Sequence, residues 1–175
     1  EKIAKYQSVV YMKIATWNLE RLSSKRKLNS IIEQIEKIDS DILILTEYHQ
    51  LIKLSNYNYR IGTTLFTEHE RKVMIFSKFP IVREIETYNE FTSCCAEFET
   101  EEGNIIVYGT VVGVLGNRRE DYCIEIERQT EDINRLSING NFCYVGDLNM
   151  TFSDNYYFTK TGRKLFVDCF EKNNM

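Results

Sequence analysis

The sequence predicts one layered domain of the α+β class, in which helices and strands of mixed direction share a core. Short apolar runs typical of buried strands alternate along the chain with stretches that carry apolar residues at helical spacing. In the middle of the chain, two strand-like stretches separated by a turn signal predict an antiparallel hairpin. The chain has 175 residues, of which 43% are hydrophobic, and no linker divides it, so it can bury one core.

A strand and a helix are expected first. Residues 13–17 predict a strand that ends at Asn18. An amphipathic helix follows and runs to about Asp39, with candidate N-caps at Ser23 and Ser24. Its apolar stripe comprises Leu28, Ile31, Ile32, Ile35 and Ile38.

Further strands are expected from residue 41 onward. Residues 41–45 and 73–76 form apolar runs, which are typical of strands covered on both faces. Residues 95–98 alternate, a turn signal covers 102–104, and the strand pattern resumes over 105–112. These last two strands form the expected hairpin.

Two more helices and a strand are expected in the last third of the chain. The stripe of the first helix comprises Tyr122, Ile126, Ile133 and Leu136. Residues 139–141 end this helix, residues 142–145 predict another buried strand, and a last helix covers 163–172. We expect residues 1–11 to be an N-terminal extension left by processing or trimming, and residues 12–175 to be the domain.

The overall charge is acidic. Lys and Arg number 22 against 26 Asp and Glu, which gives a net charge of −4 and a pI of about 5.4. A protein that binds nucleic acid through bulk electrostatics should be basic, so any phosphate chemistry must be local and metal-assisted. Arg118, Arg119 and Lys160 could meet phosphates in a local groove, but a solvated face is the preferred explanation for them. The longest apolar runs are far too short to cross a bilayer.

The five cysteines are expected to be reduced. Their number is odd, and no Cys-x-x-Cys pair occurs. The adjacent Cys94 and Cys95 would point to opposite faces of a strand. These features favour thiols used as small core residues in a cytoplasmic protein.

Polar residues follow three of the buried strands. The first strand ends at Asn18, the second at Glu47, and the late one at Asp147, with Asn149 close behind. In a layered α/β protein, the ends of neighbouring strands converge on one rim of the sheet, which would gather two carboxylates and two amides. Mg²⁺ needs only one or two carboxylates beside waters and phosphate oxygens. Gly146 would allow a sharp turn and a close backbone approach there.

Each of these residues alone has a simpler explanation, because strands often end in polar residues and Asn and Asp favour turns. Their order is more specific. The informative segments are residues 14–19, 41–47, 75–81, the Arg128-Gln129 pair and 146–149. In this order they resemble the endonuclease/exonuclease/phosphatase superfamily, which includes deoxyribonuclease-like nucleases, abasic-site endonucleases, inositol polyphosphate 5-phosphatases and neutral sphingomyelinases. The resemblance implies a four-layer α/β/β/α sandwich with its second sheet incomplete at the C-terminus.

The resemblance also implies a role for each residue at the rim. Glu47 resembles the principal metal-binding carboxylate, and Asn18 supplies an amide oxygen to the metal or its water shell. Asp147 resembles the carboxylate that positions or deprotonates the attacking water, and Asn149 orients that water and contacts the scissile phosphate. The cofactor would be Mg²⁺ or Mn²⁺. For Gln129, which lies on the apolar stripe of its helix, packing or hydrogen bonding is expected rather than catalysis.

The sequence departs from the family pattern in two places. Val111 stands where many members have a His. Tyr108 is the candidate to contact substrate instead, although a Tyr within a strand is more often a core residue. The Ser-Asp-His motif that ends the family's last strand is not found after Asn149. The two histidines, His49 and His69, lie earlier in the chain.

The leading hypothesis is a Mg²⁺-dependent phosphoesterase that hydrolyses a phosphodiester through metal-assisted attack by water. One alternative is a non-catalytic module that keeps the fold and binds a phosphorylated ligand or a partner protein, and another is a purely structural domain. The expected partner is a phosphodiester or phosphomonoester, and DNA, RNA, inositol phosphates and phospholipid headgroups all stay open. An exposed sheet edge is expected to support association.

Overall fold

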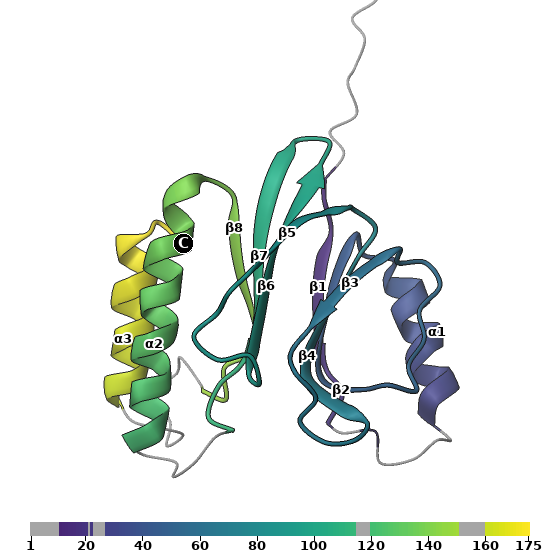
Figure 1. The fold of residues 1–175 in the computed structure, drawn as a ribbon, viewed down its shortest axis with the longest axis horizontal. Coiled ribbons are helices and arrows are strands. Elements are labelled where there is room, and N and C mark those ends of the chain that lie inside the picture. The colour runs from purple at the N-terminus through teal and green to yellow at the C-terminus, as the bar shows by residue number, and fades with distance from the viewer. Residues whose placement is uncertain (1–10, 21, 23–26, 115–119, 151–159) are drawn as a thin grey trace, which may run out of the picture.

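The computed structural model describes residues 11–20, 22, 27–114, 120–150 and 160–175. The expected N-caps at Ser23 and Ser24, the basic residues Arg118 and Arg119, and residues 1–10 of the expected extension lie outside the described residues. Two four-stranded sheets of mixed direction stack face to face, with α1 outside the first and α2 and α3 outside the second (Figure 1). This arrangement confirms the predicted α/β/β/α sandwich.

The first sheet places its strands in the order β1 (Ile14–Asn18), β2 (Ile42–His49), β4 (Glu70–Ser77) and β3 (Tyr59–Gly62). The helix α1 (Leu28–Ile38) lies between β1 and β2 in the chain, and these two strands pair in parallel, with Asn18 opposite Thr46. The other pairs are antiparallel. Because parallel strands run the same way, β1 and β2 end on the same rim.

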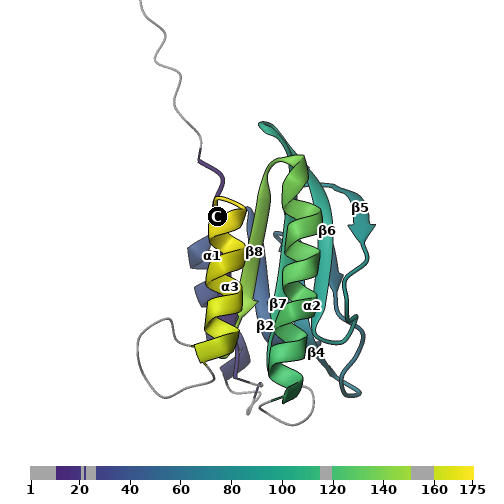
Figure 2. The ribbon, with the colours of Figure 1, turned by 90° about the vertical axis from the view of Figure 1, so that its left-hand side faces the viewer.

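The second sheet has the order β5 (Ile81–Ile85), β6 (Ser93–Thr100), β7 (Gly103–Val111) and β8 (Phe142–Asp147). The predicted hairpin is β6–β7, and β7 pairs in parallel with β8, with Val111 opposite Asp147. The long helix α2 (Glu120–Leu136) continues into the short 3₁₀ helix η2 (Ser137–Asn139). Together with α3 (Lys160–Lys172) it covers the outer face of this sheet (Figure 2).

The main core lies between the two sheets. In β2, Ile42 and Ile44 face the second sheet, whereas Leu43 and Leu45 pack on the side of α1. Both faces of β2 are therefore covered, which is why the apolar run in its sequence shows no alternation.

Two strands, β3 and β5, are not indicated by the sequence pattern. Both are edge strands, and residues in the middle of β5 and at the start of β3 are exposed, so neither has the apolar pattern of a buried strand. The structure also extends β2 beyond Leu45 to His49, so Glu47 lies within the strand rather than after it. The last helix begins at Lys160 rather than at Arg163.

All five cysteines are free thiols, as expected. Cys94 packs in the core between the sheets, and Cys95 packs on the opposite face of β6 beside Tyr108. Burial raises the pKa of the Cys95 thiol to about 12. The two adjacent thiols therefore serve as small core residues that stay protonated near neutral pH.

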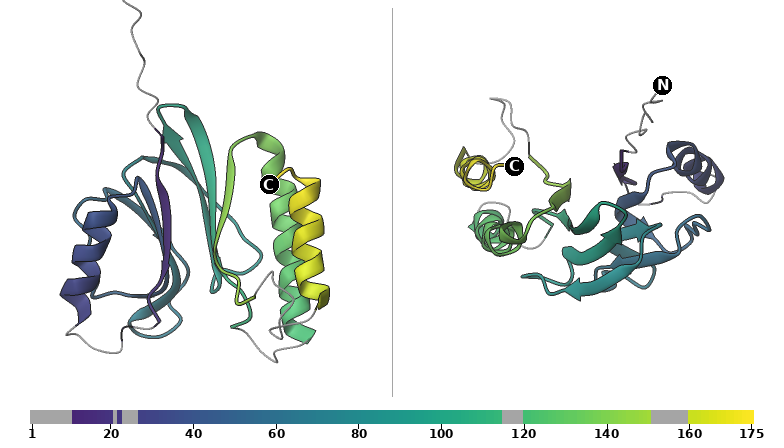
Figure 3. Two further views of the ribbon diagram at one scale, coloured as in Figure 1. Left: turned by 180° about the vertical axis from the view of Figure 1, so that it is seen from behind. Right: turned by 90° about the horizontal axis from the view of Figure 1, so that it is seen from above.

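The strands β1 and β8 lie along the same edge of the sandwich (Figure 3). Within the described residues, no strand pairs with the outer side of either one. Association through such an edge stays a prediction, which sedimentation velocity at several protein concentrations would test. No helix in the described ranges is both long enough and apolar enough to span a bilayer.

Candidate active site

The two sheets are joined at one rim by a hydrogen bond between the last residues of two strands. Asn18 ends β1 and Asp147 ends β8, and the side-chain amide of Asn18 donates to Asp147 Oδ2 across 2.7 Å. The amide oxygen of Asn18 accepts the backbone N–H of Glu20 at 2.9 Å. The Glu20 N–H therefore orients the Asn18 side chain, and Asn18 in turn orients the Asp147 carboxylate.

Glu47 lies beside this pair. It follows Thr46, the residue that pairs with Asn18 across the β1–β2 ladder. Its φ of +53° is uncommon for a residue other than glycine, and such conformations concentrate at functional sites. The side chain is partly exposed, and within the described part of the chain nothing forms a hydrogen bond or ion pair with its carboxylate. That carboxylate is available to a ligand.

The turn after β8 arranges the remaining rim residues. The backbone N–H of Asn149 donates to Asp147 Oδ1 at 3.0 Å, so both carboxylate oxygens of Asp147 accept hydrogen bonds. Asn149 has a φ of +48° and donates from its side-chain amide to the Val112 carbonyl at 2.8 Å. The structure thus brings Asn18, Asp147 and Asn149 into one bonded group.

Gly146 is needed at the position before Asp147. Its φ is +148°, and an added Cβ atom would lie 1.9 Å from the carbonyl oxygen of Thr110 in β7. No backbone oxygen tolerates such an approach, so β7 and β8 can pair here only through glycine.

We therefore expect Gly146→Ala to reduce the free energy of unfolding by about 3 kcal/mol, because the paired backbones must move apart. Gly103→Ala is the matched control, since Gly103 also has a positive φ, of +113°, but no heavy atom within 4 Å of an added Cβ. That control should cost only about 1 kcal/mol. Urea denaturation of both variants measures the difference, and equal losses would contradict the close contact.

Behind the rim, α2 supplies a buried carboxylate. Glu125 is only 5% exposed. One of its oxygens accepts the Tyr88 hydroxyl at 2.7 Å, and the other accepts the backbone N–H of Gly113 at 2.8 Å. Removal from water raises the pKa of the Glu125 carboxyl above its ordinary value, and the two hydrogen bonds partly oppose that shift.

Tyr108 does not reach the rim. Its side chain is 0% exposed, and its hydroxyl donates to Asp132 at 3.0 Å beneath α2. The expectation that Tyr108 contacts substrate is not met by this structure, because a side chain enclosed by its own helix and sheet cannot touch a ligand. Gln129 is also buried and donates to Thr110 Oγ1 at 2.9 Å, which is a hydrogen-bonding role of the expected kind.

The positions linked to histidine add no side chain to the bonded group, although Val111 itself lies opposite Asp147 in the β7–β8 ladder. Val111 is buried in the core between the sheets. His49 accepts the backbone N–H of Leu51 on Nδ1 at 3.1 Å, and its ring centroid lies 5.9 Å from that of His69. Neither histidine forms a hydrogen bond to Asn18, Asp147 or Asn149 in the described residues.

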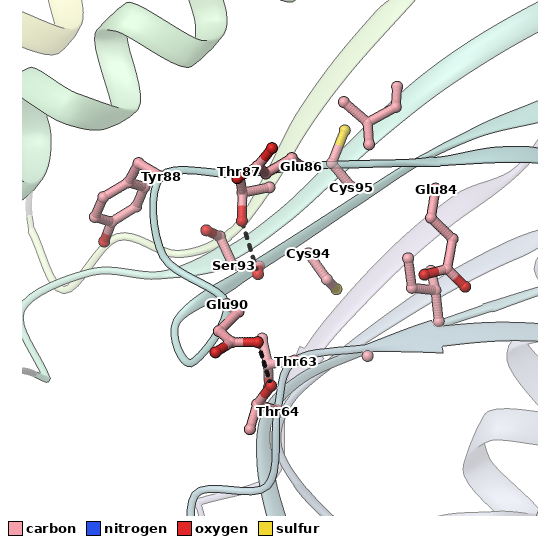
Figure 4. Close-up of a pocket in the computed structure, with 13 residues that line it drawn as sticks. Thr63, Thr64, Glu84, Glu86, Thr87, Tyr88, Glu90, Ser93, Cys94 and Cys95 are labelled. Atoms are coloured by element: carbon pink, nitrogen blue, oxygen red, sulfur yellow. Dashed lines mark hydrogen bonds between the residues drawn. The ribbon is translucent and has the colours of Figure 1, made fainter.

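A cavity of about 660 Å³ lies at the other edge of the sandwich, between β3 and the β5–β6 segment (Figure 4). Glu84, Glu86 and Glu90 line it, and no Lys or Arg is found among its described lining residues. Thr64 donates to the Glu90 carboxylate at 2.9 Å. Because several carboxylates repel a phosphate anion, this cavity is a poor phosphate site, and the rim is the better candidate.

Comparison with known proteins identifies the family of this chain. The sequence profile of the Endonuclease/Exonuclease/phosphatase family matches residues 15–166, a range that includes every residue of the rim. The chain belongs to this family. A search of curated proteins by sequence found no match.

Three solved structures share the family fold with this chain. The 3′ phosphatase NExo from Neisseria, bound to its product DNA hairpin, has a TM-score of 0.69 at 16% identity over 92% of this chain and 71% of that one. Sphingomyelinase C from Streptomyces griseocarneus has a TM-score of 0.64 at 14% identity, covering 93% and 69%. A β-hairpin deletion mutant of β toxin from Staphylococcus aureus has a TM-score of 0.60 at 15% identity, covering 93% and 72%.

The rim of this Endonuclease/Exonuclease/phosphatase domain fits a hard divalent cation. Among the described residues, no three His, Cys, Asp or Glu side chains gather closely enough to enclose a metal ion. Mg²⁺ does not need such a group, because it keeps several waters and takes one or two carboxylates. The Glu47 carboxylate, which has no hydrogen-bond or ion-pair partner among the described residues, and the second lone pair of the Asn18 amide oxygen are oxygen donors of the right kind.

In this Endonuclease/Exonuclease/phosphatase domain, the sequence did not identify Glu125 as a residue connected to the rim. It lies three positions after Tyr122 and four before Gln129, and all three are buried on the inner face of α2. A charged residue on an apolar stripe signals a buried polar partner. The sequence thus carries a signal for Glu125, but not the identity of its partner.

We expect Glu125→Gln to change the pH dependence of stability. Because the folded protein has the higher pKa at this carboxyl, it holds the proton more tightly than the unfolded chain does. The corresponding stability is full below the ordinary pKa of about 4.5 and is lost as the pH rises through the folded pKa. Glutamine has no proton to lose there, so the variant should gain stability relative to wild type from pH 4 to pH 8. Urea denaturation across this range is the measurement, and a difference independent of pH would contradict the expectation.

Proposed function

We propose that this chain is a phosphoesterase that uses Mg²⁺ or Mn²⁺ to hydrolyse a phosphodiester at the rim. The observation that carries the proposal is the hydrogen bond between Asn18 and Asp147, which joins the two sheets of a domain of this family. The orientation of Asp147 is thereby held before any substrate arrives. Glu47 is next to Thr46, the strand partner of Asn18.

Glu47 would hold the cation, with the Asn18 amide oxygen beside it or in contact with its water shell. When bound, such an ion neutralises charge that develops on the phosphoryl group. Glu47 has a positive φ and lies between Thr46 and Tyr48, which pair with Val73 and Arg71 of β4.

Asp147 would position the attacking water and accept its proton. Its two oxygens accept hydrogen bonds from Asn18 and Asn149, and each oxygen keeps a lone pair that a water can use. The side-chain amide of Asn149 gives one hydrogen to Val112 and would offer the other to a phosphate oxygen.

The net charge and one structural neighbour bear on the class of substrate. The net charge of −4 favours a substrate bound through a few local phosphate contacts over a long duplex bound by bulk electrostatics. One structural neighbour was solved with a DNA hairpin, so a nucleic acid end is among the substrates we propose to test.

The test is hydrolysis of bis(p-nitrophenyl) phosphate by the purified chain with Mg²⁺, with Mn²⁺ and with EDTA, in parallel with p-nitrophenyl phosphate. We expect release of p-nitrophenol from the diester that requires the metal. Glu84→Gln is the control, because it removes a carboxylate from the acidic cavity at the other edge. Metal-independent release, or no release with either ion, would refute the proposal and favour a binding module.

A further inference from the structure

One peptide unit connects the buried carboxylate on α2 to the rim. The carbonyl of Val112 accepts the side-chain amide of Asn149 at 2.8 Å, and the N–H of Gly113, which belongs to the same peptide unit, donates to Glu125 at 2.8 Å. The two hydrogen bonds therefore hold opposite ends of one rigid plane. If this peptide plane rotated, the Val112 carbonyl that accepts the Asn149 side-chain amide would rotate with it.

The anchor of this peptide plane is itself fixed. Glu125 sits on the inner face of a helix that packs closely on α3, because a Cβ added at Gly162 would lie 2.7 Å from Ile126. The Tyr88 hydroxyl holds the other oxygen of Glu125 at 2.7 Å. Buried groups of this kind in close-packed surroundings have few alternative positions.

The backbone at this point does not hold the plane by itself. Gly113 has a φ of +76°, and an added Cβ would lie 2.9 Å from the Tyr122 ring. Glycine tolerates both signs of φ, so the φ of Gly113 does not by itself fix this peptide plane, although the preceding Val112 N–H bonds to the Asp147 carbonyl at 2.9 Å. The hydrogen bond that the Gly113 N–H donates to Glu125 ties this peptide to α2 and restricts that rotation.

We propose that Glu125 is a positioning residue, which orients the amide of Asn149 through the Val112–Gly113 peptide. This inference rests on the proposed function, in which Asn149 contacts the phosphate. Glu125 does not touch the substrate. A carboxylate that accepts the peptide N–H also strengthens the carbonyl of that peptide as an acceptor, which tightens its hold on Asn149.

The experiment compares Glu125→Leu with two controls. Leucine fills similar space but accepts no hydrogen bond, so kcat should fall about 10- to 100-fold, while KM and the Mg²⁺ concentration for half activation stay within about twofold. Glu125→Gln keeps an oxygen for Gly113 and should restore most of kcat. Asp132→Leu removes another buried carboxylate from α2, one that bonds to Tyr108 and the Tyr88 backbone, and should leave kcat within about twofold of wild type.

A double-mutant cycle separates positioning from general damage. If Glu125 acts through Asn149, adding Glu125→Leu to Asn149→Ala should lower kcat no further. Losses that multiply would overturn the proposal, as would an equal loss in Asp132→Leu. If Glu125→Leu does not fold, Glu125→Asp takes its place, because it keeps the charge but is one methylene too short to reach Gly113.

A spectroscopic measurement makes the inference independent of activity. The Asn149 side-chain amide, assigned by ¹⁵N–¹H NMR, should move toward the chemical shift of a solvent-exposed amide in Glu125→Leu and keep its wild-type shift in Glu125→Gln. A wild-type protein without hydrolysis would refute the proposed function, and the amide shift would still decide the link to Glu125. An unchanged shift in Glu125→Leu would overturn it.

Discussion

Replacing Glu47 with glutamine is expected to lower phosphodiesterase activity at limiting Mg²⁺ by roughly 100-fold or more, and to raise the Mg²⁺ concentration needed for half activation. Glutamine keeps the length and hydrogen-bonding capacity of the side chain but removes the charge that holds a hard cation. The free energy of unfolding should change little, because the Glu47 carboxylate has no partner in the described part of the chain.

Two measurements check this expectation. Activity as a function of Mg²⁺ concentration gives the shift in half activation, and relaxation of water protons by Mn²⁺ reports binding even without turnover. Glu36→Gln, on the exposed side of α1, is the matched control and should behave like wild type. A Glu47→Gln protein as active as its parent at limiting Mg²⁺ would show that Glu47 is not the ligand.

Asp147→Asn should impair turnover rather than metal binding. We expect turnover to fall roughly 100-fold or more while Mn²⁺ binding is nearly unchanged, because the variant removes the proton acceptor rather than the main anchor of the metal. The structure adds a second consequence. Both oxygens of Asp147 accept N–H donors, from Asn18 and from Asn149, so an amide nitrogen at this position must face one of them. The variant should therefore also lose about 1 kcal/mol of stability.

The comparison of Glu47→Gln with Asp147→Asn is sharper than either variant alone. The first should be impaired in metal binding and the second in turnover, measured on the same preparations. Asp168→Asn, an exposed substitution on α3, controls for the loss of one negative charge. Equal loss of Mn²⁺ binding in both rim variants would contradict the separate roles assigned to the two carboxylates.

Much of the fold could be predicted because buried residues form recognisable apolar patterns in the sequence. The continuous apolar run of β2 predicts a strand covered on both faces, and the apolar stripes of α1 and α2 each predict one covered helix face. The structure has all three elements where these patterns predict them. β3 and β5 show no such pattern, because exposed residues occupy the start of β3 and the middle of β5. Their pairing depends on the neighbouring strand and not on their own composition.

Part of the candidate site could also be predicted from the sequence, and part could not. By itself the sequence determined that the polar residues Asn18, Glu47 and Asp147 follow apolar runs, because a buried run stops where the chain meets water. The structure then showed that Glu47 lies within β2 rather than at its end. Only the tertiary structure decided that Asn18 meets Asp147 across 129 residues, since that contact depends on how the two sheets stack. The tertiary structure also decided that Tyr108 points beneath α2 and that Glu125 accepts a hydrogen bond from Gly113. Which face of β7 is covered by a helix, and which backbone group a buried carboxylate meets, both depend on where α2 packs on the sheet.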